Sequence, residues 1–211
     1  PLLGAIPPIT VADWIIEFKK YQITDEYKYV NFNMTLDDFK FIYWWEWGHR
    51  QLGRVIGIVW AIGFLWLLFF KSISNGWLMR FALLGLLGGL QGFLGWWMVS
   101  SGLEETMLDV ASYRLAIHLG MAFLILGLIT WFLLKIKLRK EDLILARRAR
   151  DYSMARISTF LVVVLFIQIL LGALVAGIDA GRSFNDWPLM AGLLFPPDAF
   201  SYKPLIRNIF E

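Results

Sequence analysis

Cysteine is absent from the 211-residue sequence, and histidine occurs only twice, at His49 and His118. Without cysteine the chain has no disulfide framework, no zinc–thiolate or iron–sulfur centre and no cysteine nucleophile. Charged residues are also sparse, at 18% of the chain, with a net charge of +3. Any transition-metal chemistry carried by these residues must therefore use the two histidines.

Apolar residues are abundant, because hydrophobic side chains make up 58% of the chain and 18 glycines add to them. A soluble domain has a smaller apolar share, whereas a helix that crosses a hydrocarbon core of about 30 Å needs about 20 consecutive apolar residues. Four such runs occur, at 51–70, 78–99, 115–134 and 157–178. The sequence therefore predicts an all-α, polytopic membrane helical bundle with four transmembrane helices.

Basic residues are unevenly shared among the links between these runs. The link 135–156 holds eight Lys and Arg, the link 71–80 holds Lys71 and Arg80, and the link 100–113 holds none. Because cytoplasmic loops retain Lys and Arg, we expect both basic links on the cytoplasmic or matrix side and both chain ends outside. A positive-inside loop explains the basic run, so nucleic acid is not expected as a partner.

The two ends of the chain differ in composition from the runs. In the first segment Trp14, Ile15, Phe18 and Tyr21 recur at helical spacing, which predicts short amphipathic helices with one face on the membrane surface. We expect one membrane domain over 1–211, divided into an outside loop (1–43), the bundle (44–178) and a second outside segment (179–211) with turns at Trp187, Pro188, Pro196 and Pro197. The chain begins with Pro1 rather than Met, so we expect it to be a fragment of a longer protein.

Polar residues gather on one stripe at the outer end of the first run. At offsets of 0, 3, 4, 7, 8 and 11 the stripe holds Glu46, His49, Arg50, Gly53, Arg54 and Gly57. On the third run Arg114 and His118 lie four residues apart, again on one face. Charged groups at the edge of a span are costly unless they face a protein interior or a wet cavity.

The two histidines lie at similar depth on separate helices. His49 is 21 residues from Phe70 and His118 is 16 from Leu134, a difference of about 7 Å at 1.5 Å per residue, which helix tilt can absorb. Such a pair can ligate a haem iron between helices, with glycines letting the flat macrocycle approach.

Each of these residues also has a simpler interpretation. A histidine at a membrane interface is often only hydrogen-bonded, and Arg50, Arg54 and Arg114 either snorkel to lipid phosphate or pair with haem propionates. Glu46 is either an interfacial cap or an acid/base group beside a porphyrin. An aromatic belt is the ordinary role for Trp44, Trp45, Trp47, Trp96 and Trp97, although such rings also line haem pockets.

Four ordered motifs carry a family resemblance: FKFIYWWEWGHRQLGRVIG (39–57), LQGFLGWWMVSSGL (90–103), SYRLAIHLG (112–120) and GALVAGIDAGRSFNDWPLM (172–190). They resemble heme A synthase, in the branch shared by mitochondria and alphaproteobacteria. The resemblance implies an eight-helix protein made of two four-helix halves, of which this chain covers mainly the first. It also implies that Glu46, His49 and His118 form the site where heme O is oxidised, and that a haem b centre lies in the half outside this chain.

The reaction implied by the resemblance converts the C8 methyl of heme O into the formyl of heme A by successive hydroxylations, with water as the oxygen source. Heme O is then the substrate, and Glu46 is a proton acceptor near the methyl. Heme O synthase, cytochrome c oxidase assembly factors and a second copy of the chain are partners to consider. The implied location is the bacterial cytoplasmic membrane, or the mitochondrial inner membrane in a eukaryote.

Two alternatives use the same residues. A bis-histidine b-type cytochrome would employ His49 and His118 only for electron transfer, with Glu46 structural. A transporter or assembly scaffold would bind no haem at all. Extracted pigment distinguishes them, because only a synthase accumulates heme A or an alcohol intermediate.

Overall fold

The computed structural model describes residues 4, 6–70, 73–102, 110–149, 151–183, 186, 188–195, 200, 201 and 203. Four helices in these ranges are long and apolar enough to cross a membrane. They are α3 (Leu36–Phe70), α4 (Asn75–Gly102), α5 (Ser112–Lys137) and α7 (Tyr152–Gly177). The prediction of an all-α polytopic membrane protein is confirmed.

α3 begins earlier than the apolar run that predicted it. Leu36 lies 15 residues (51 − 36) before Gln51, and the helix has 35 residues. At 1.5 Å per residue it is about 52 Å long, well above a hydrocarbon thickness of about 30 Å. Thr35 caps this start, because its hydroxyl accepts from the Asp38 amide (3.3 Å) while the Asp38 carboxylate accepts from the Thr35 amide (3.0 Å). The first turns of α3 therefore lie outside the hydrocarbon.

The chain divides into two compact units, residues 1–109 and 110–211. Each unit has its own helix pair, α3 with α4 in the first and α5 with α7 in the second. The single membrane domain over 1–211 stays a prediction.

In the first unit, Trp60 sets the approach of α3 to α4. Its indole nitrogen donates a hydrogen bond to the Phe81 carbonyl oxygen (3.1 Å), and its ring stacks on Phe64 with centroids 5.1 Å apart. The ring lies over Gly85, where an added Cβ would overlap it. The close contact of the two helices therefore depends on a residue without a side chain at position 85.

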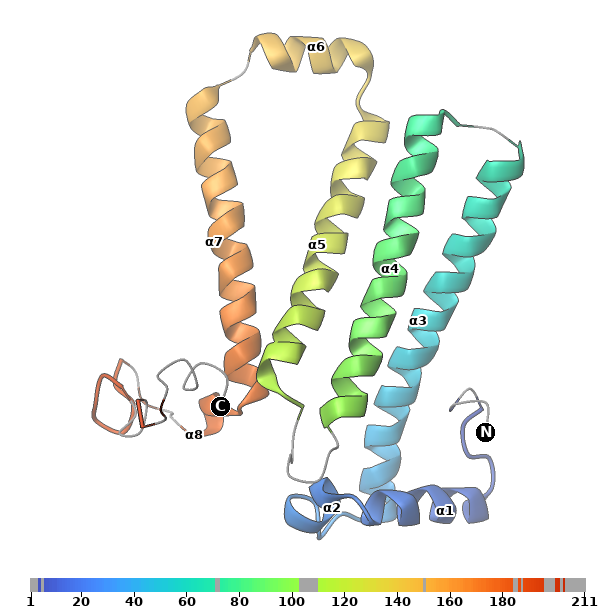
Figure 1. Ribbon diagram of the computed structural model, residues 1–211, viewed down its shortest axis with the longest axis vertical. Helices are drawn as coiled ribbons and strands as arrows, with labels where there is room; N and C mark the ends of the chain where they lie inside the picture. Colours follow the sequence, from blue (N-terminus) through green and yellow to red (C-terminus); the bar gives the residue numbers. More distant parts are fainter. Residues whose placement is uncertain are drawn as a thin grey trace. The chain divides into compact units, whose positions relative to one another are not determined.

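The helix α1 (Val11–Gln22) lies across the N-terminal end of α3, which is the end predicted to be outside (Figure 1). Trp14 is buried against Tyr43 and Trp44, with ring centroids 5.0 and 5.7 Å apart. Phe18 and Tyr21 lie on the Phe39 ring at 5.2 and 5.3 Å. The expectation of a membrane-facing surface formed by Trp14, Ile15, Phe18 and Tyr21 is wrong for three of them. Trp14, Phe18 and Tyr21 contact α3, whereas Ile15 is 42% exposed.

A polar network closes the turn from α1 to α2 (Asp25–Tyr29). The Tyr21 hydroxyl donates to the Glu26 carboxylate (3.1 Å), and the Asn31 amide donates to both the Tyr21 oxygen (2.8 Å) and the same carboxylate (3.2 Å). Burial raises the pKa of Tyr21 to about 12, so this phenol stays protonated and able to donate at neutral pH.

In the second unit, small residues let α5 and α7 meet at one end. An added Cβ at Gly120 would come within 2.6 Å of the Leu170 side chain, and one at Gly177 within 2.6 Å of the Ser112 Cα. Ala116 and Ala173 are buried at the same contact. The other ends of the two helices are bridged by α6 (Lys140–Arg148), and α8 (Ala180–Ser183) follows α7 (Figure 1).

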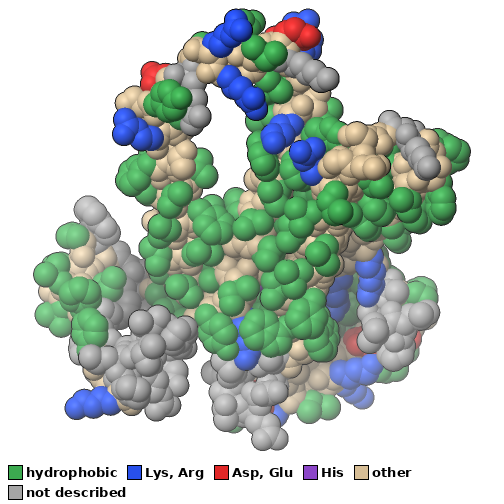
Figure 2. Space-filling view, turned by 45° about the horizontal axis from the view of Figure 1, so that its top comes forward, with side chains coloured by type: hydrophobic (Ala, Val, Ile, Leu, Met, Phe, Trp, Pro, Cys, Tyr) green, Lys and Arg blue, Asp and Glu red, His purple; other side chains and the backbone are tan. Residues whose placement is uncertain are grey.

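Hydrophobic and basic side chains lie on different parts of the surface. Hydrophobic side chains cover much of the visible helix surface, and Lys and Arg gather around α6 (Figure 2). Of the residues named in the sequence analysis, Pro1, Lys71, Trp187, Pro196 and Pro197 lie outside the described ranges.

Candidate haem-binding site

The polar stripe on α3 forms as predicted. Glu46, His49 and Arg50 occupy consecutive positions of one helix face and are exposed. The Glu46 carboxylate lies 3.9 Å from the Arg50 guanidinium, with side chains 66% and 47% exposed. An ion pair this open contributes little to stability. Because both side chains are exposed, both groups are accessible to a ligand.

The chain that leads into α1 also reaches this stripe. The Gly4 carbonyl oxygen accepts hydrogen bonds from Gln51 (3.1 Å) and Arg54 (3.5 Å). Gly4 has a φ of +70°, which a side-chain-bearing residue adopts only at a cost. Its contact orients the amide and guanidinium at the level where the predicted span begins.

Glycines leave space beside the stripe on both helices of this unit. Gly53 lies seven residues before Trp60 and Gly57 three residues before it, so all three share one face of α3. Trp60 contacts α4. On α4, Gly88 and Gly92 share a face with Gly85, which Trp60 covers. The two glycine pairs therefore lie on the faces that α3 and α4 turn toward each other.

These glycines also lie at matching depth. Because the helices run antiparallel and Trp60 is level with about 81–85, Gly53 is level with about 88–92. An added Cβ would meet nothing within 4 Å at any of Gly53, Gly57, Gly88 and Gly92. Such open, side-chain-free faces suit a flat ligand that approaches the backbone closely.

The α4 glycines are functional candidates that the sequence reasoning missed. Their spacing in 85–92, at i, i+3 and i+7, is a helical small-residue pattern that was available from the sequence. By itself the pattern indicates only helix packing. It is the contact of Trp60 with Gly85 that turns this face toward α3.

Arg114 and His118 lie near the start of α5 in the second unit. The Arg114 Nε donates to the Tyr113 hydroxyl oxygen (3.1 Å), and its guanidinium lies 5.4 Å from that ring centroid. His118 is half-buried, and its Nδ1 atom is buried. Ala116 and Gly120, two residues before and after His118, face α7, so the imidazole is on the other side of α5.

The predicted site residues are thus divided between the units. Glu46, His49, Arg50 and Arg54 share one face of α3, and Arg114 and His118 share one face of α5. The pairing of the two histidines on one iron stays a prediction.

Tryptophans cluster near the N-terminal end of α3. Trp44 contacts Trp14 and also Trp47, with ring centroids 5.7 and 5.4 Å apart. The Trp47 indole nitrogen is buried without a hydrogen-bond acceptor among the described residues. Trp45 and Trp96 are 69% and 65% exposed. Exposed indoles at a span's end are typical of an interfacial belt.

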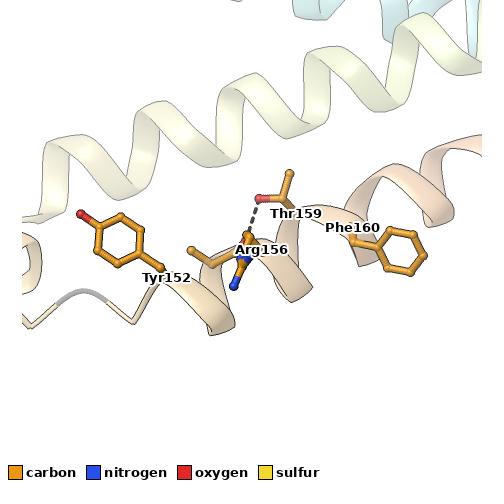
Figure 3. Close-up of a pocket in the computed structure, with 5 residues that line it drawn as sticks. Tyr152, Arg156, Thr159 and Phe160 are labelled. Carbon is orange, nitrogen blue, oxygen red and sulfur yellow. Dashed lines mark hydrogen bonds between the residues drawn. The ribbon is translucent and has the colours of Figure 1, made fainter.

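A hollow of about 370 Å³ lies on α7, lined by Tyr152, Ala155, Arg156, Thr159 and Phe160 (Figure 3). The Thr159 hydroxyl donates to the Ala155 carbonyl oxygen (2.8 Å) within the helix. All lining residues come from one helix, at the end of α7 opposite Gly177 and therefore opposite the start of α5. The hollow contains none of the predicted site residues.

Together these observations define a class: a multi-pass helical membrane protein with a carboxylate, guanidiniums and an imidazole on one face of α3, beside open glycine positions. The profile of the cytochrome oxidase assembly protein family (COX15-CtaA) matches residues 1–211. The chain belongs to this family.

Curated relatives share more than half of their aligned residues with the chain. A heme A synthase of Dinoroseobacter shibae is 56% identical over 211 residues, which are 100% of this chain and 55% of that protein. A heme A synthase of Ruegeria sp. is 55% identical over 213 residues, covering 100% of this chain and 56% of that protein. One of Cereibacter sphaeroides is 54% identical over 208 residues, covering 99% and 53%. The chain therefore spans about half the length of these relatives, and no solved structure matches it.

Proposed function

We propose that this chain is the part of a heme A synthase that binds heme O and oxidises its C8 methyl to the formyl group of heme A, for cytochrome c oxidase assembly. The observation that carries the proposal is the α3 face, where Glu46 and His49 adjoin the open positions Gly53 and Gly57. Relatives named heme A synthase, aligned along the whole chain, support it.

The residues fit an iron porphyrin by the chemistry of their side chains. His49 and His118 supply imidazoles, the usual axial ligands of haem iron in helical proteins. Arg50, Arg54 and Arg114 supply guanidiniums, which bind carboxylates such as propionates in bidentate fashion. Gly53 and Gly57 leave the adjacent helix face open to the macrocycle.

Glu46 is proposed as the proton acceptor. With water as the oxygen source, oxidation of a methyl to a formyl consumes one water and releases four protons and four electrons. A haem b, which the resemblance implies outside this chain, would supply the acceptor for the electrons. Glu46 lies one turn before His49 and is open to solvent, so its carboxylate can accept protons near the substrate and pass them to water.

The proposed partners and location follow from this activity. Heme O must arrive from the enzyme that makes it, heme O synthase, and heme A must pass to cytochrome c oxidase assembly factors. The relatives are alphaproteobacterial, which favours the bacterial cytoplasmic membrane, with the mitochondrial inner membrane as the eukaryotic equivalent. A homo-oligomer is compatible with the exposed apolar helix surfaces.

Glu46→Gln in the full-length protein tests the catalytic assignment. We expect heme A to fall at least about a hundredfold, the lower end of the range for loss of an acid/base group, while heme O or its alcohol accumulates. Extracted haems are separated by chromatography. Glu17→Gln, the same change on α1, is the matched control and should leave the heme A yield unchanged. Normal heme A in Glu46→Gln would refute the assignment.

The histidines distinguish the synthase from an electron-transfer cytochrome. His49→Ala and His118→Ala should each lower the haem content and alter the reduced-minus-oxidised spectrum, since each removes an axial ligand. If the parent protein contains one unmodified haem and never heme A, the cytochrome interpretation replaces ours.

A further inference from the structure

The helix α1 has a second apolar face that the described residues do not cover. Val11, Ile15 and Ile16 are 72%, 42% and 53% exposed. At 100° per residue Val11 and Ile15 lie beside the face that packs on α3. Ile16 lies about 100° beyond Ile15, on the side of the helix away from α3 and next to Lys20. The remaining side of the helix carries Asp13, Glu17 and Lys20. α1 therefore has a face covered by α3, an open apolar face and a charged face.

The chain before α1 continues this apolar surface. Ile6 and Ile9 are 64% and 79% exposed. They lie between α1 and Gly4, whose carbonyl accepts from Gln51 at the start of the predicted span. The open face of α1 is thus continuous, along the chain, with a segment held against the outer end of a membrane helix.

The level of α1 is set by aromatic residues of α3. Trp14 packs on Tyr43 and Trp44, and Trp44 and Trp45 belong to the cluster of exposed indoles at this end of the span. Tyr and Trp concentrate at the headgroup level of a bilayer. α1 therefore lies where lipid headgroups meet the hydrocarbon.

Charge on α1 agrees with this position. Lys19 lies on the open side, one turn after Ile15, and is exposed. A lysine beside an apolar face extends its aliphatic stem over the acyl chains and its ammonium to the phosphates. Glu17 and Lys20 form an ion pair at 2.6 Å on the charged side, which suits a face turned to water.

From these placements we infer that α1 is an interfacial helix, whose Val11, Ile15 and Ile16 side chains are buried in the outer leaflet. The occupant of the open face is lipid, not another segment of protein. The inference does not depend on the proposed activity, because it uses only the seating of α1 on α3 and the chemistry of its surface. It keeps Ile15 from the membrane-facing set expected from the sequence and replaces Trp14, Phe18 and Tyr21, which contact α3, by Val11 and Ile16.

The absence of cysteine allows a direct test. Single variants Val11→Cys, Ile15→Cys and Ile16→Cys of the full-length protein, freed of any cysteine outside these residues, are labelled with a fluorophore sensitive to polarity. They are reconstituted in vesicles of phosphatidylcholine and phosphatidylglycerol. Quenching by doxyl-labelled lipid is compared with quenching by aqueous iodide. Glu17→Cys is the matched control on the charged face.

We expect doxyl lipid to quench the labels at 11, 15 and 16 roughly twofold or more, with blue-shifted emission and little effect of iodide. The label at 17 should show the reverse. Iodide quenching at 15 as strong as at 17 would place the face in water. Protection of position 15 from both quenchers would mean that protein covers it; either result overturns the inference. An unchanged elution profile in size-exclusion chromatography shows that each labelled variant is folded.

Discussion

Gly85 illustrates how one residue determines the distance between two membrane helices. Between spans there is little hydrophobic driving force, so association depends on close packing and hydrogen bonds. The Trp60 ring occupies the space of a missing Cβ at Gly85 and donates to the Phe81 carbonyl oxygen. Beyond this contact, toward the outer end, Gly88 and Gly92 leave the α4 face open. Glycine on α4 thus allows helix contact at position 85 and leaves open space at positions 88 and 92.

Gly85→Ala should destabilise the protein by about 1–3 kcal/mol, the usual range for overpacking, because Trp60 must move. Thermal unfolding in detergent measures this as a lower transition temperature. Gly89→Ala is the matched control, since a Cβ there meets nothing within 4 Å and alanine favours the helix. Adding Trp60→Leu to Gly85→Ala should recover part of the loss. Equal stability of the Gly85 and Gly89 variants would contradict the proposed packing of the Trp60 ring on Gly85.

At the scale of the single helix, α1 is defined by its capping box. The Asp13 carboxylate accepts from the Thr10 amide (2.9 Å) and hydroxyl (2.7 Å), and the Thr10 hydroxyl accepts from the Asp13 amide (3.2 Å). These hydrogen bonds lower the pKa of Asp13 below its ordinary value of 3.8, and the one from the Thr10 amide has the largest effect. Such an end is needed because α1 is only 12 residues long and is marginal without tertiary contacts.

A pH dependence of α1 follows from this lowered pKa. The ionised form of Asp13 is the one that caps, so its contribution is fully present above pH 3.8 and is lost as the pH falls through the lower folded-state value. A carboxyl titration followed by NMR should show Asp13 below the usual range, and Thr10→Ala should return it toward that range. Thr24→Ala, which removes the cap of α2 instead, should leave the Asp13 titration in place.

Thr10→Ala should also loosen the helix at neutral pH. Loss of an N-cap costs roughly 1 kcal/mol, which corresponds to about fivefold faster hydrogen exchange in 11–22 if opening is local. Exchange measured by mass spectrometry checks this. No change in that segment would mean that contacts with α3 alone hold α1.

For the molecule as a whole, the distribution of basic residues predicts the orientation in the membrane. In the first unit Arg80 lies near the start of α4, at the end of the helix pair opposite Glu46 and His49. In the second unit α6, with Arg147 and Arg148 in its last turn, bridges the ends of α5 and α7 opposite Arg114 and His118. A positive-inside arrangement therefore places Glu46 and His49 toward the outer face.

Accessibility of single cysteines tests this arrangement, since the chain has none of its own. Asn33→Cys, in the turn before α3, should react with a membrane-impermeant maleimide in intact cells stripped of the outer membrane. Ser74→Cys and Ser153→Cys should react only after permeabilisation. All three positions are exposed, so a difference reports sidedness, and labelling of Ser74→Cys in intact cells would reverse the orientation.

The sequence by itself determined the helices and the α3 stripe. In lipid every backbone polar group must be satisfied within the segment, so an apolar run of 20 residues has to be helical. Once α3 is helical, the spacing of Glu46, His49, Arg50 and Arg54 places them on one face without any tertiary contact. The motifs that carry the family resemblance lie mostly on these helices, and the family profile matches the same residues.

Only the tertiary structure decided which faces are covered. Trp14, Ile15, Phe18 and Tyr21 have the periodicity of a membrane-facing surface. Trp14 is buried against α3 and Phe18 and Tyr21 are half-buried there, whereas Ile15 is open together with Val11 and Ile16. Periodicity shows that a helix has an apolar face but not what covers it, because the partner comes from a distant part of the chain. For the same reason the glycines of α4 acquired a role only through Trp60, 25 residues (85 − 60) before Gly85.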